Sequence, residues 1–335
     1  MSVGLVSYGL DGHRLEYVEF FASLIEELGG QSVCFRKWQD VVFREDSAFF
    51  LMIEEDLIGF SLCAVARSAF RRKTVGLLFR GREAASPKSM AQKIKSVILR
   101  SLRASRAISV VSIVPFSVAP EISRVASHSI YDPQLWDQNA TLTVHASDIS
   151  HDIVTAANGR KIVVALGRQD NDKGFGWFCE LWRDEAIREN FLFACAGKIS
   201  ANLTEAADEF VHTGGYRVDR HIDRRELMSL YQAADYVWAA YPPSYDQASG
   251  IMGRAVQYNV PVIVRESSTS QRVLNELTAG YVPIQFGDQR ENVSKLMHSQ
   301  ASLLKAGLGD QASSRSGVAQ AKCSAVDVLR SVLAL

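Results

Sequence analysis

The chain has 335 residues, 47% of them hydrophobic and 22% charged, and its 37 basic and 37 acidic side chains balance to a net charge of zero. This composition excludes a disordered or fibrous chain, is long enough for two domains, and gives no overall charge that would favour nucleic acid. The five cysteines are scattered without a C-x-x-C pair, which argues against a disulfide framework or zinc site and favours a reducing compartment. Without a secretory signal pattern or a run of about 18 apolar residues, we expect a cytoplasmic protein that does not span a membrane.

The first half of the chain alternates β-rich runs with helical patterns. Val3–Ser7 predicts a strand, Tyr8–His13 a polar turn, and residues 15–28 a helix that ends at the pair Gly29-Gly30. Further strands are predicted at Ser32–Phe35, Phe49–Ile53, Val75–Phe79 and Ile108–Val114. Such alternation indicates a parallel sheet covered by helices.

The alternation restarts after the turn signal Asn158-Gly159. Strands are predicted at Ile162–Leu166, Phe191–Ala196, Tyr236–Ala240 and Pro261–Val264, with helices that include Arg225–Ala234 and Gly250–Tyr258. The sequence therefore predicts an α/β protein with two Rossmann-like domains, residues 1–150 and 151–317. An amphipathic helix over residues 318–335 would then fold back onto either half.

Ligands of open α/β sheets bind at the carboxyl ends of the strands, so the loops there are the first candidates for a site. One is Gly167–Gly174, where Arg168 and Lys173 lie five residues apart between glycines. A guanidinium fork, an ammonium and the following helix N-terminus suit a diphosphate. The alternative is a solvated turn in which Lys173 pairs with Asp170 or Asp172.

A second candidate loop runs from Pro242 to Ile251. Ser249 predicts a helix N-cap, and Gly250 would let a ligand approach the free amides of the first helical turn. The alternative is a capped helix beside an exposed Asp246.

The amino-terminal turn is a third candidate, which we place on the acceptor side: Gly9, Asp11, Gly12, His13 and Arg14. It lacks the G-x-G-x-x-G spacing of a dinucleotide site. His13 is either an acid/base group or a histidine at a helix start.

Two of these loops together resemble a known family. Gly167-Arg168, followed after four residues by Lys173-Gly174, is similar to the G-R-x-x-x-x-K-G element of the family 4 (retaining) GT-B glycosyltransferases. Downstream, Pro243-Ser244-Tyr245-Asp246, Ala255 and Pro261-Val262-Ile263 follow that family's P-S-x-E…E-A…G-x-P-V-I element in the same register. The resemblance covers residues 160–285.

The resemblance implies a GT-B fold whose two Rossmann-like domains bind a nucleotide-diphosphate sugar in the cleft between them. Arg168 and Lys173 would neutralise the diphosphate without a metal ion or other cofactor, and Asp246 would face the donor sugar. Together with His13 these make up the candidate catalytic set. The donor-binding residues would be Gly167, Arg168, Lys173, Gly215, Tyr216, Arg217, Asp246, Ser249, Gly250, Ile251 and Arg254.

One position departs from the family, because Arg254 stands where a carboxylate usually accepts hydrogen bonds from the ribose. Arginine only donates. Arg254 would therefore add a third cation at the diphosphate, pair with Asp246 or Glu266, or mark a site that no longer binds nucleotide sugars.

A basic segment completes the candidate features. Residues 67–106 carry twelve Lys and Arg against one acid, Glu83. Within Lys88–Arg106 the apolar residues Met90, Ile94, Val97, Ile98 and Leu102 share one helix face. The segment predicts contact with an anionic membrane surface, or else a solvated helix whose apolar side faces the sheet. Nucleic-acid binding is not expected, since aromatic residues are not interleaved.

The interpretation that follows is a glycosyltransferase with a glycan or lipid-linked acceptor, acting in surface polysaccharide or exopolysaccharide assembly and retaining the anomeric configuration. Two alternatives stay open: a GT-B nucleotide-sugar epimerase or hydrolase, and a catalytically degenerate GT-B partner protein.

Overall fold

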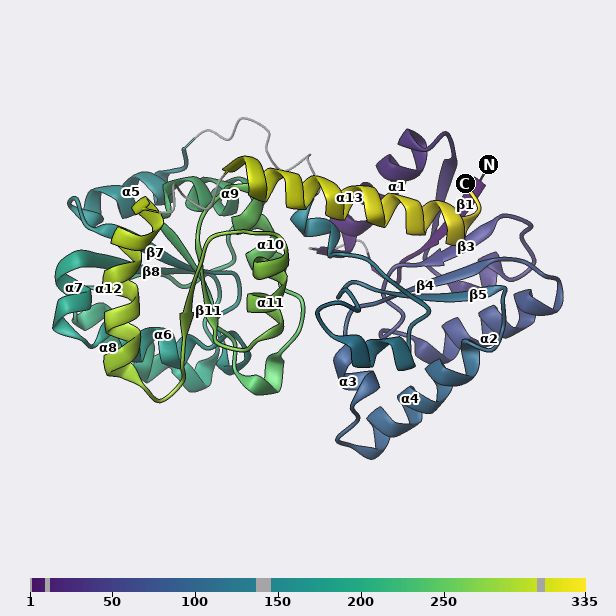
Figure 1. Cartoon of the computed structure of the whole chain (residues 1–335), viewed down its shortest axis with the longest axis horizontal. Helices are drawn as coiled ribbons and strands as arrows, with labels where there is room; N and C mark the ends of the chain where they lie inside the picture. Colours follow the sequence, from purple (N-terminus) through teal and green to yellow (C-terminus); the bar gives the residue numbers. More distant parts are fainter. Residues whose placement is uncertain (1, 10–12, 137–145, 306–310) are drawn as a thin grey trace. The chain divides into compact units, whose positions relative to one another are not determined.

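The computed structural model describes residues 2–9, 13–136, 146–305 and 311–335, and divides into two compact units. The first comprises Met1–Pro133 and Ala319–Leu335, and the second Gln134–Val318. Sequence patterning predicted the change of domain at residues 150/151, whereas the second unit begins at Gln134. Each unit holds one sheet of parallel strands flanked by helices (Figure 1).

The sheet of the first unit has the strand order β2-β1-β3-β4-β5-β6. Its strands are β1 (Ser2–Val6), β2 (Gln31–Phe35), β3 (Ser47–Phe50), β4 (Thr74–Leu78), β5 (Ile108–Ser112) and β6 (His128–Ser129). Its helices are α1 (His13–Glu27), α2 (Leu57–Ala69), α3 (Gly81–Ala85) and α4 (Met90–Leu102). Strands β3, β4 and β5 are buried along their whole length and β1 from Val3 onward, as the apolar runs predicted.

The sheet of the second unit has the order β12-β11-β10-β7-β8-β9. Its strands are β7 (Lys161–Leu166), β8 (Phe191–Ala196), β9 (Tyr216–Val218), β10 (Tyr236–Ala239), β11 (Val262–Arg265) and β12 (Tyr281–Ile284). Its helices are α5 (Asp148–Ala157), α6 (Phe175–Trp182), α7 (Glu185–Asn190), α8 (Thr204–His212), α9 (Arg224–Ala233), α10 (Gly250–Gln257), α11 (Thr269–Glu276) and α12 (Gln289–Lys305). These two parallel sheets confirm the predicted α/β fold class.

The last helix, α13 (Gln311–Leu333), settles which half the chain end joins. From Ala319 onward it belongs to the first unit. Ser47 at the start of β3 donates a hydrogen bond to the carbonyl of Leu333, 2.7 Å away. The terminus therefore closes the first unit rather than the second.

Arg67 corrects the predicted basic surface. It is fully buried, and its guanidinium donates to the Thr74 hydroxyl at 3.0 Å and to the backbone carbonyls of Val41, Arg44, Asp46 and Lys73. Burial lowers the pKa of Arg67. A buried charge needs such a full set of acceptors, so Arg67 ties the loop before β3 to α2 and is not a surface cation.

Candidate functional site

Because the strands of the second sheet are parallel, their carboxyl ends form one edge, which we call the carboxyl edge. Gly167 follows β7 there, and its N–H donates to the carbonyl of Ala196 at the end of β8. Ala240 and Tyr241 follow β10 at the same edge. The loops after β7 and β10 are the two that carry the family-like residues.

Gly174 holds these two loops together. It has a left-handed φ of 67°, and a Cβ at this position would overlap the carbonyl oxygen of Ala240. The indole N–H of Trp238 donates to the Lys173 carbonyl at 3.3 Å. Only glycine permits both the backbone conformation and the close approach. Gly174 therefore allows the backbone of the loop after β7 to contact the loop after β10.

Lys173 itself lies against two aromatic rings. Its ammonium is 4.5 Å from the ring centre of Tyr241 and 4.8 Å from that of Tyr245. Burial alone lowers the pKa of Lys173, but Tyr241, Tyr245 and Asp170 together outweigh it and hold the pKa above its ordinary value. The side chain is therefore a positioned, protonated cation.

Arg168 is held less tightly. Its side chain is 73% exposed, and its Nε lies 3.2 Å from a carboxylate oxygen of Asp170. The other carboxylate oxygen of Asp170 accepts the backbone N–H of Lys173 at 2.9 Å. The solvated-turn alternative expected the side chain of Lys173 to pair with Asp170 or Asp172. Instead, Asp170 orders the loop backbone and contacts the guanidinium.

The tip of α10 meets this loop. The Ser249 hydroxyl accepts the N–H of Met252, forming the predicted N-cap, and lies 2.9 Å from the Tyr241 hydroxyl. Ile251 Cδ1 would lie 3.7 Å from a Cβ placed on Gly167. The structure thus brings together Gly167, Lys173, Ser249 and Ile251 from two separate loops.

Gly250 has a packing role that sequence patterning did not show. A Cβ there would overlap the side-chain amide of Gln134, and a Cβ on Gly253 would crowd the Gln134 backbone. Gln257 donates to the Gln134 carbonyl at 2.8 Å. The Cα of Gly250 therefore packs against the Gln134 side chain, and Gly250 is half-buried.

Asp246 is engaged at the start of α11. Its Oδ1 accepts the N–H of Thr269 at 2.8 Å and lies 3.3 Å from an Nη of Arg265. An anion at a helix N-terminus is favourable, so the loop after β10 is fastened to α11 through this carboxylate. Glu266, the other suggested partner of Arg254, lies near Gln285 and Lys295.

Arg254 is buried, with 3% of its surface exposed, and donates to the Gln257 side chain at 3.3 Å. It lies in the interior of α10, one turn after Gly250. Its guanidinium is therefore part of the packing beneath the helix tip.

The predicted donor-binding residues Gly215, Tyr216 and Arg217 do not form one loop in the structure. Gly215 precedes β9 and lies at its amino end, while Tyr216 and Arg217 belong to the strand, where Arg217 pairs with Asp208. Asp219 and Arg220 follow the strand and reach the carboxyl edge. Asp219 accepts the N–H of Ile199 at 2.9 Å, and this bond lowers its pKa.

The acceptor-side turn is described in part. Gly9 accepts a hydrogen bond from Ser7 at 2.8 Å, and Arg14 pairs with Glu55 at 2.6 Å. Asp11, Gly12 and the side chain of His13 lie outside the described residues.

The first unit also holds a carboxylate that was not predicted from the sequence. Glu54 follows β3 and accepts the backbone N–H groups of Phe79 and Arg80, at 2.8 and 2.6 Å, where β4 ends. Burial raises the pKa of Glu54, against the opposing effects of Lys95 and these amides. The run Glu54-Glu55-Asp56 directly after a predicted strand was the available signal.

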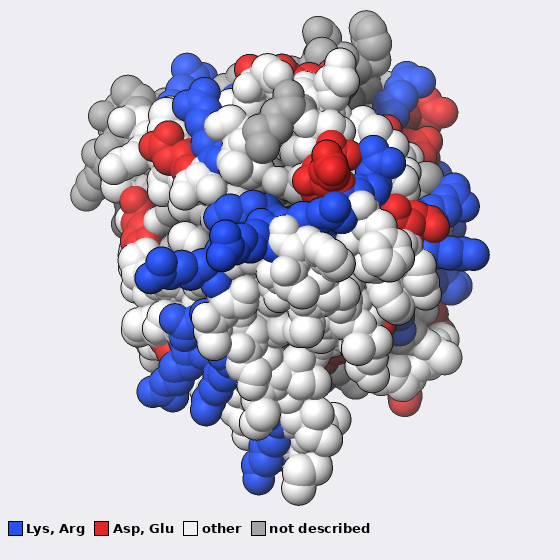
Figure 2. Space-filling model, turned by 90° about the vertical axis from the view of Figure 1, so that its right-hand side faces the viewer, with Lys and Arg blue, Asp and Glu red and all other residues white. Residues whose placement is uncertain are grey.

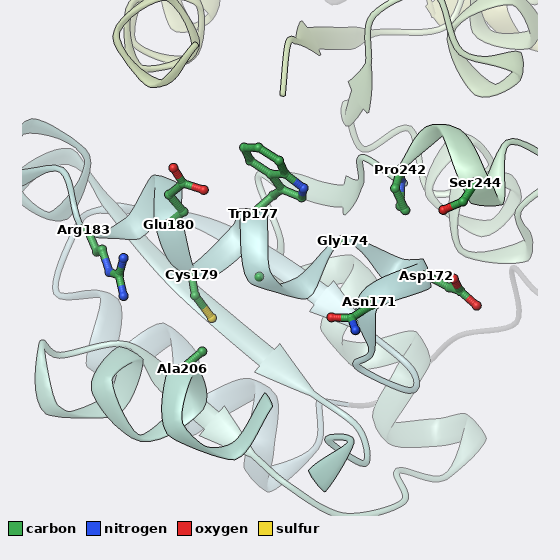
Figure 3. A pocket seen from close by; sticks show the side chains of 11 residues that line it. Asn171, Asp172, Gly174, Trp177, Cys179, Glu180, Arg183, Ala206, Pro242 and Ser244 are labelled. Atoms are coloured by element: carbon green, nitrogen blue, oxygen red, sulfur yellow. The ribbon is translucent and has the colours of Figure 1, made fainter. Parts of the chain in front are cut away.

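A pocket of about 490 Å³ lies along α6 in the second unit. Figure 3 shows Asn171, Asp172 and Gly174 at one end of it beside Pro242 and Ser244, with Trp177, Glu180 and Arg183 further along the helix. Among the described residues no group of three or more His, Cys, Asp or Glu side chains is arranged to hold a metal ion. The pocket is lined by the loops after β7 and β10, by α6 and, through Ala206, by α8.

No protein-family model and no curated protein matches the sequence. Solved structures do match it. An E. coli structure described as trehalose-6-phosphate bound with UDP-2-fluoro glucose is 9% identical, covers 100% of this chain and 99% of that one, and has a TM-score of 0.67. Anabaena HepE in complex with UDP and glucose is 14% identical, with coverage of 99% and 100% and a TM-score of 0.62. A UDP-forming α,α-trehalose-phosphate synthase from Burkholderia vietnamiensis is 13% identical, with coverage of 97% and 77% and a TM-score of 0.59. These likenesses show that the chain has the GT-B fold.

Proposed function

We propose that this protein is a glycosyltransferase that moves a sugar from a nucleotide-diphosphate sugar to a glycan or lipid-linked acceptor in surface polysaccharide assembly. The observation that carries the proposal is the positioned ammonium of Lys173, held on two tyrosine rings where the loops after β7 and β10 meet. Arg168 supplies a second cation on the same loop. Two of the similar solved structures contain UDP or a UDP-sugar analogue, which makes UDP-sugars the first donors to test.

Sugar transfer requires stabilisation of the negative charge that develops on the leaving diphosphate. When the acceptor hydroxyl forms its bond to the anomeric carbon, the bond from that carbon to the diphosphate oxygen breaks, and the nucleoside diphosphate leaves with an additional negative charge. Arg168 and Lys173 would stabilise that charge without a metal ion. The acceptor proton passes to a base, and retention of configuration is part of the proposal by family resemblance.

A donor screen tests the proposal directly. We expect one class among UDP-, GDP-, ADP- and dTDP-sugars to stabilise the protein by about 2.7 kcal/mol at a hundredfold excess over its Kd. Product analysis with and without acceptor then separates a transferase from an epimerase or hydrolase. If none of the four classes shifts the unfolding transition, the proposal fails, and binding without turnover would favour the degenerate partner protein.

Arg254 offers a sharper test within the same site. Arg254→Glu restores the residue type usual in the family but places a carboxylate where 3% of the surface is exposed. We expect donor affinity to fall at least about tenfold, about 1.4 kcal/mol, and the free energy of unfolding to fall by about 3 kcal/mol.

Arg254→Met is the matched control, because it keeps much of the side-chain volume without either charge. Donor affinity should be measured by titration calorimetry at a temperature where both variants are folded. Unchanged or improved donor binding in Arg254→Glu would show that Arg254 has no favourable role there.

A further inference from the structure

The outward side of α2 is apolar. Its inward side buries Phe60, Cys63 and Ala64, as expected for a helix on a sheet. On the opposite side Ile58, Leu62 and Val65 are 69%, 56% and 57% exposed. A helix that is apolar all round is ordinarily covered on both sides, so a covering surface is indicated.

The neighbouring helix α4 continues the same feature. It packs against α2 and buries Ser96, Leu99 and Leu102. The sequence pattern placed five apolar residues of this helix on one face. Three of them are exposed in the structure: Met90 at 69%, Ile94 at 56% and Val97 at 62%. The exposed apolar residues of α2 and α4, together with Phe70 after α2, form what we call the α2–α4 apolar face: Ile58, Leu62, Val65, Phe70, Met90, Ile94 and Val97.

Most exposed large apolar side chains of the first unit lie in this face, the others among the described residues being Leu15, Val33 and Phe43. Among the described residues, the second unit exposes only Val154 and Val211 as large apolar side chains, each on a different helix. Scattered apolar residues of that kind are ordinary, whereas a contiguous apolar patch marks an interaction surface.

Cations border the face. Lys88, Lys93, Arg100 and Arg103 are exposed on or beside α4, and Arg71 is exposed after α2. Neither helix contains an aspartate or glutamate. Figure 2 shows this side of the molecule as a broad uncharged area with Lys and Arg along much of its border and a few Asp and Glu side chains at the rest.

We propose that the protein docks on an anionic lipid surface through the α2–α4 apolar face. The apolar side chains would enter the boundary between headgroups and acyl chains, while the bordering cations contact lipid phosphates. A protein interface fits less well, because lysine is depleted in such interfaces relative to the rest of a protein surface. None of the described helices is long and apolar enough to span a bilayer. This docking goes beyond the proposed sugar transfer and does not depend on it.

Flotation of the full-length protein with vesicles tests the docking. The probes are phosphatidylcholine vesicles with and without phosphatidylglycerol, at low and physiological salt. The test variant is Leu62→Ser with Ile94→Ser, and its matched control is Val154→Ser with Val211→Ser, which removes exposed apolar side chains from the second unit. Lys93→Glu with Arg100→Glu tests the bordering charge.

We expect the parent and the control to bind anionic vesicles at least about tenfold more tightly than neutral ones. The Leu62/Ile94 variant should lose at least about tenfold in affinity for anionic vesicles, and the charge variant should lose its preference for them. Unfolding temperatures show that each variant is folded, and a donor shift measured in parallel reports separately on the sugar-nucleotide proposal.

Three results would overturn the docking proposal. The first is equal binding of the parent to both vesicle types, and the second is unchanged vesicle binding by the Leu62/Ile94 variant. The third is a parent protein that is a dimer in solution and a variant that is a monomer, with no vesicle binding by either. The last would assign the face to a second copy of the chain.

Discussion

Replacing Lys173 by Met is expected to weaken binding of the nucleotide-sugar donor by about two orders of magnitude. The ammonium is held 4.5 Å from the ring centre of Tyr241, so the cation is placed before the donor arrives. Loss of one such charge contact to a leaving diphosphate costs about 2–4 kcal/mol. Methionine keeps the unbranched chain against the rings, so the free energy of unfolding should fall by only about 1 kcal/mol. Titration calorimetry measures the loss of donor binding, and initial rates measure the accompanying loss of turnover.

Arg168→Ala should show the same direction of effect with less change in stability, since its side chain is 73% exposed. Lys161→Met is the matched control. Lys161 begins β7 at the opposite edge of the sheet, where it pairs with Asp235 at 2.7 Å. Parent-like donor binding and turnover in the Lys173 variant would show that the ammonium does not contact the donor. An equal loss in the Lys161 variant would show that general charge, and not position, is responsible.

Gly174→Ala is expected to destabilise the second unit by about 2–4 kcal/mol and to lower donor affinity with it. An alanine there must adopt a left-handed φ, which costs about 1–2 kcal/mol, and its Cβ would overlap the Ala240 carbonyl oxygen. Relief of that overlap moves the loop after β7 away from the loop after β10, and Lys173 moves with it. Chemical denaturation and donor titration measure the two effects.

Gly176→Ala controls for the added methyl group. Gly176 lies inside α6, has no left-handed φ, and a Cβ there meets no atom within 4 Å. Alanine also has the higher helix propensity, so this variant should be neutral or more stable by up to about 1 kcal/mol. If Gly174→Ala unfolds at the same denaturant concentration as Gly176→Ala, the two loops do not make the close contact that the prediction requires.

The sequence by itself determined the fold class and the local structure of the candidate site. Buried apolar runs such as Ile162–Leu166 identify strands because a parallel strand is covered on both faces. Ser249 was readable as an N-cap because capping depends on residues three positions apart. The cation-bearing loop after β7 was recognisable for the same reason, since its residues are neighbours in the chain.

Only the tertiary structure decided which residues meet across the chain. Lys173 rests on Tyr241 and Tyr245, and Gln134 covers Gly250, through contacts between segments that are between 68 and 116 residues apart. The apolar pattern of α4 was visible in the sequence, but not which side of the helix would pack inward. Helical periodicity shows that apolar residues share one side of a helix, but not which surface that side contacts. Burial of Arg67 likewise required the carbonyl groups of Arg44 and Asp46, which are 23 and 21 residues away in the chain. A buried charge is stable only where folding brings its hydrogen-bond acceptors together.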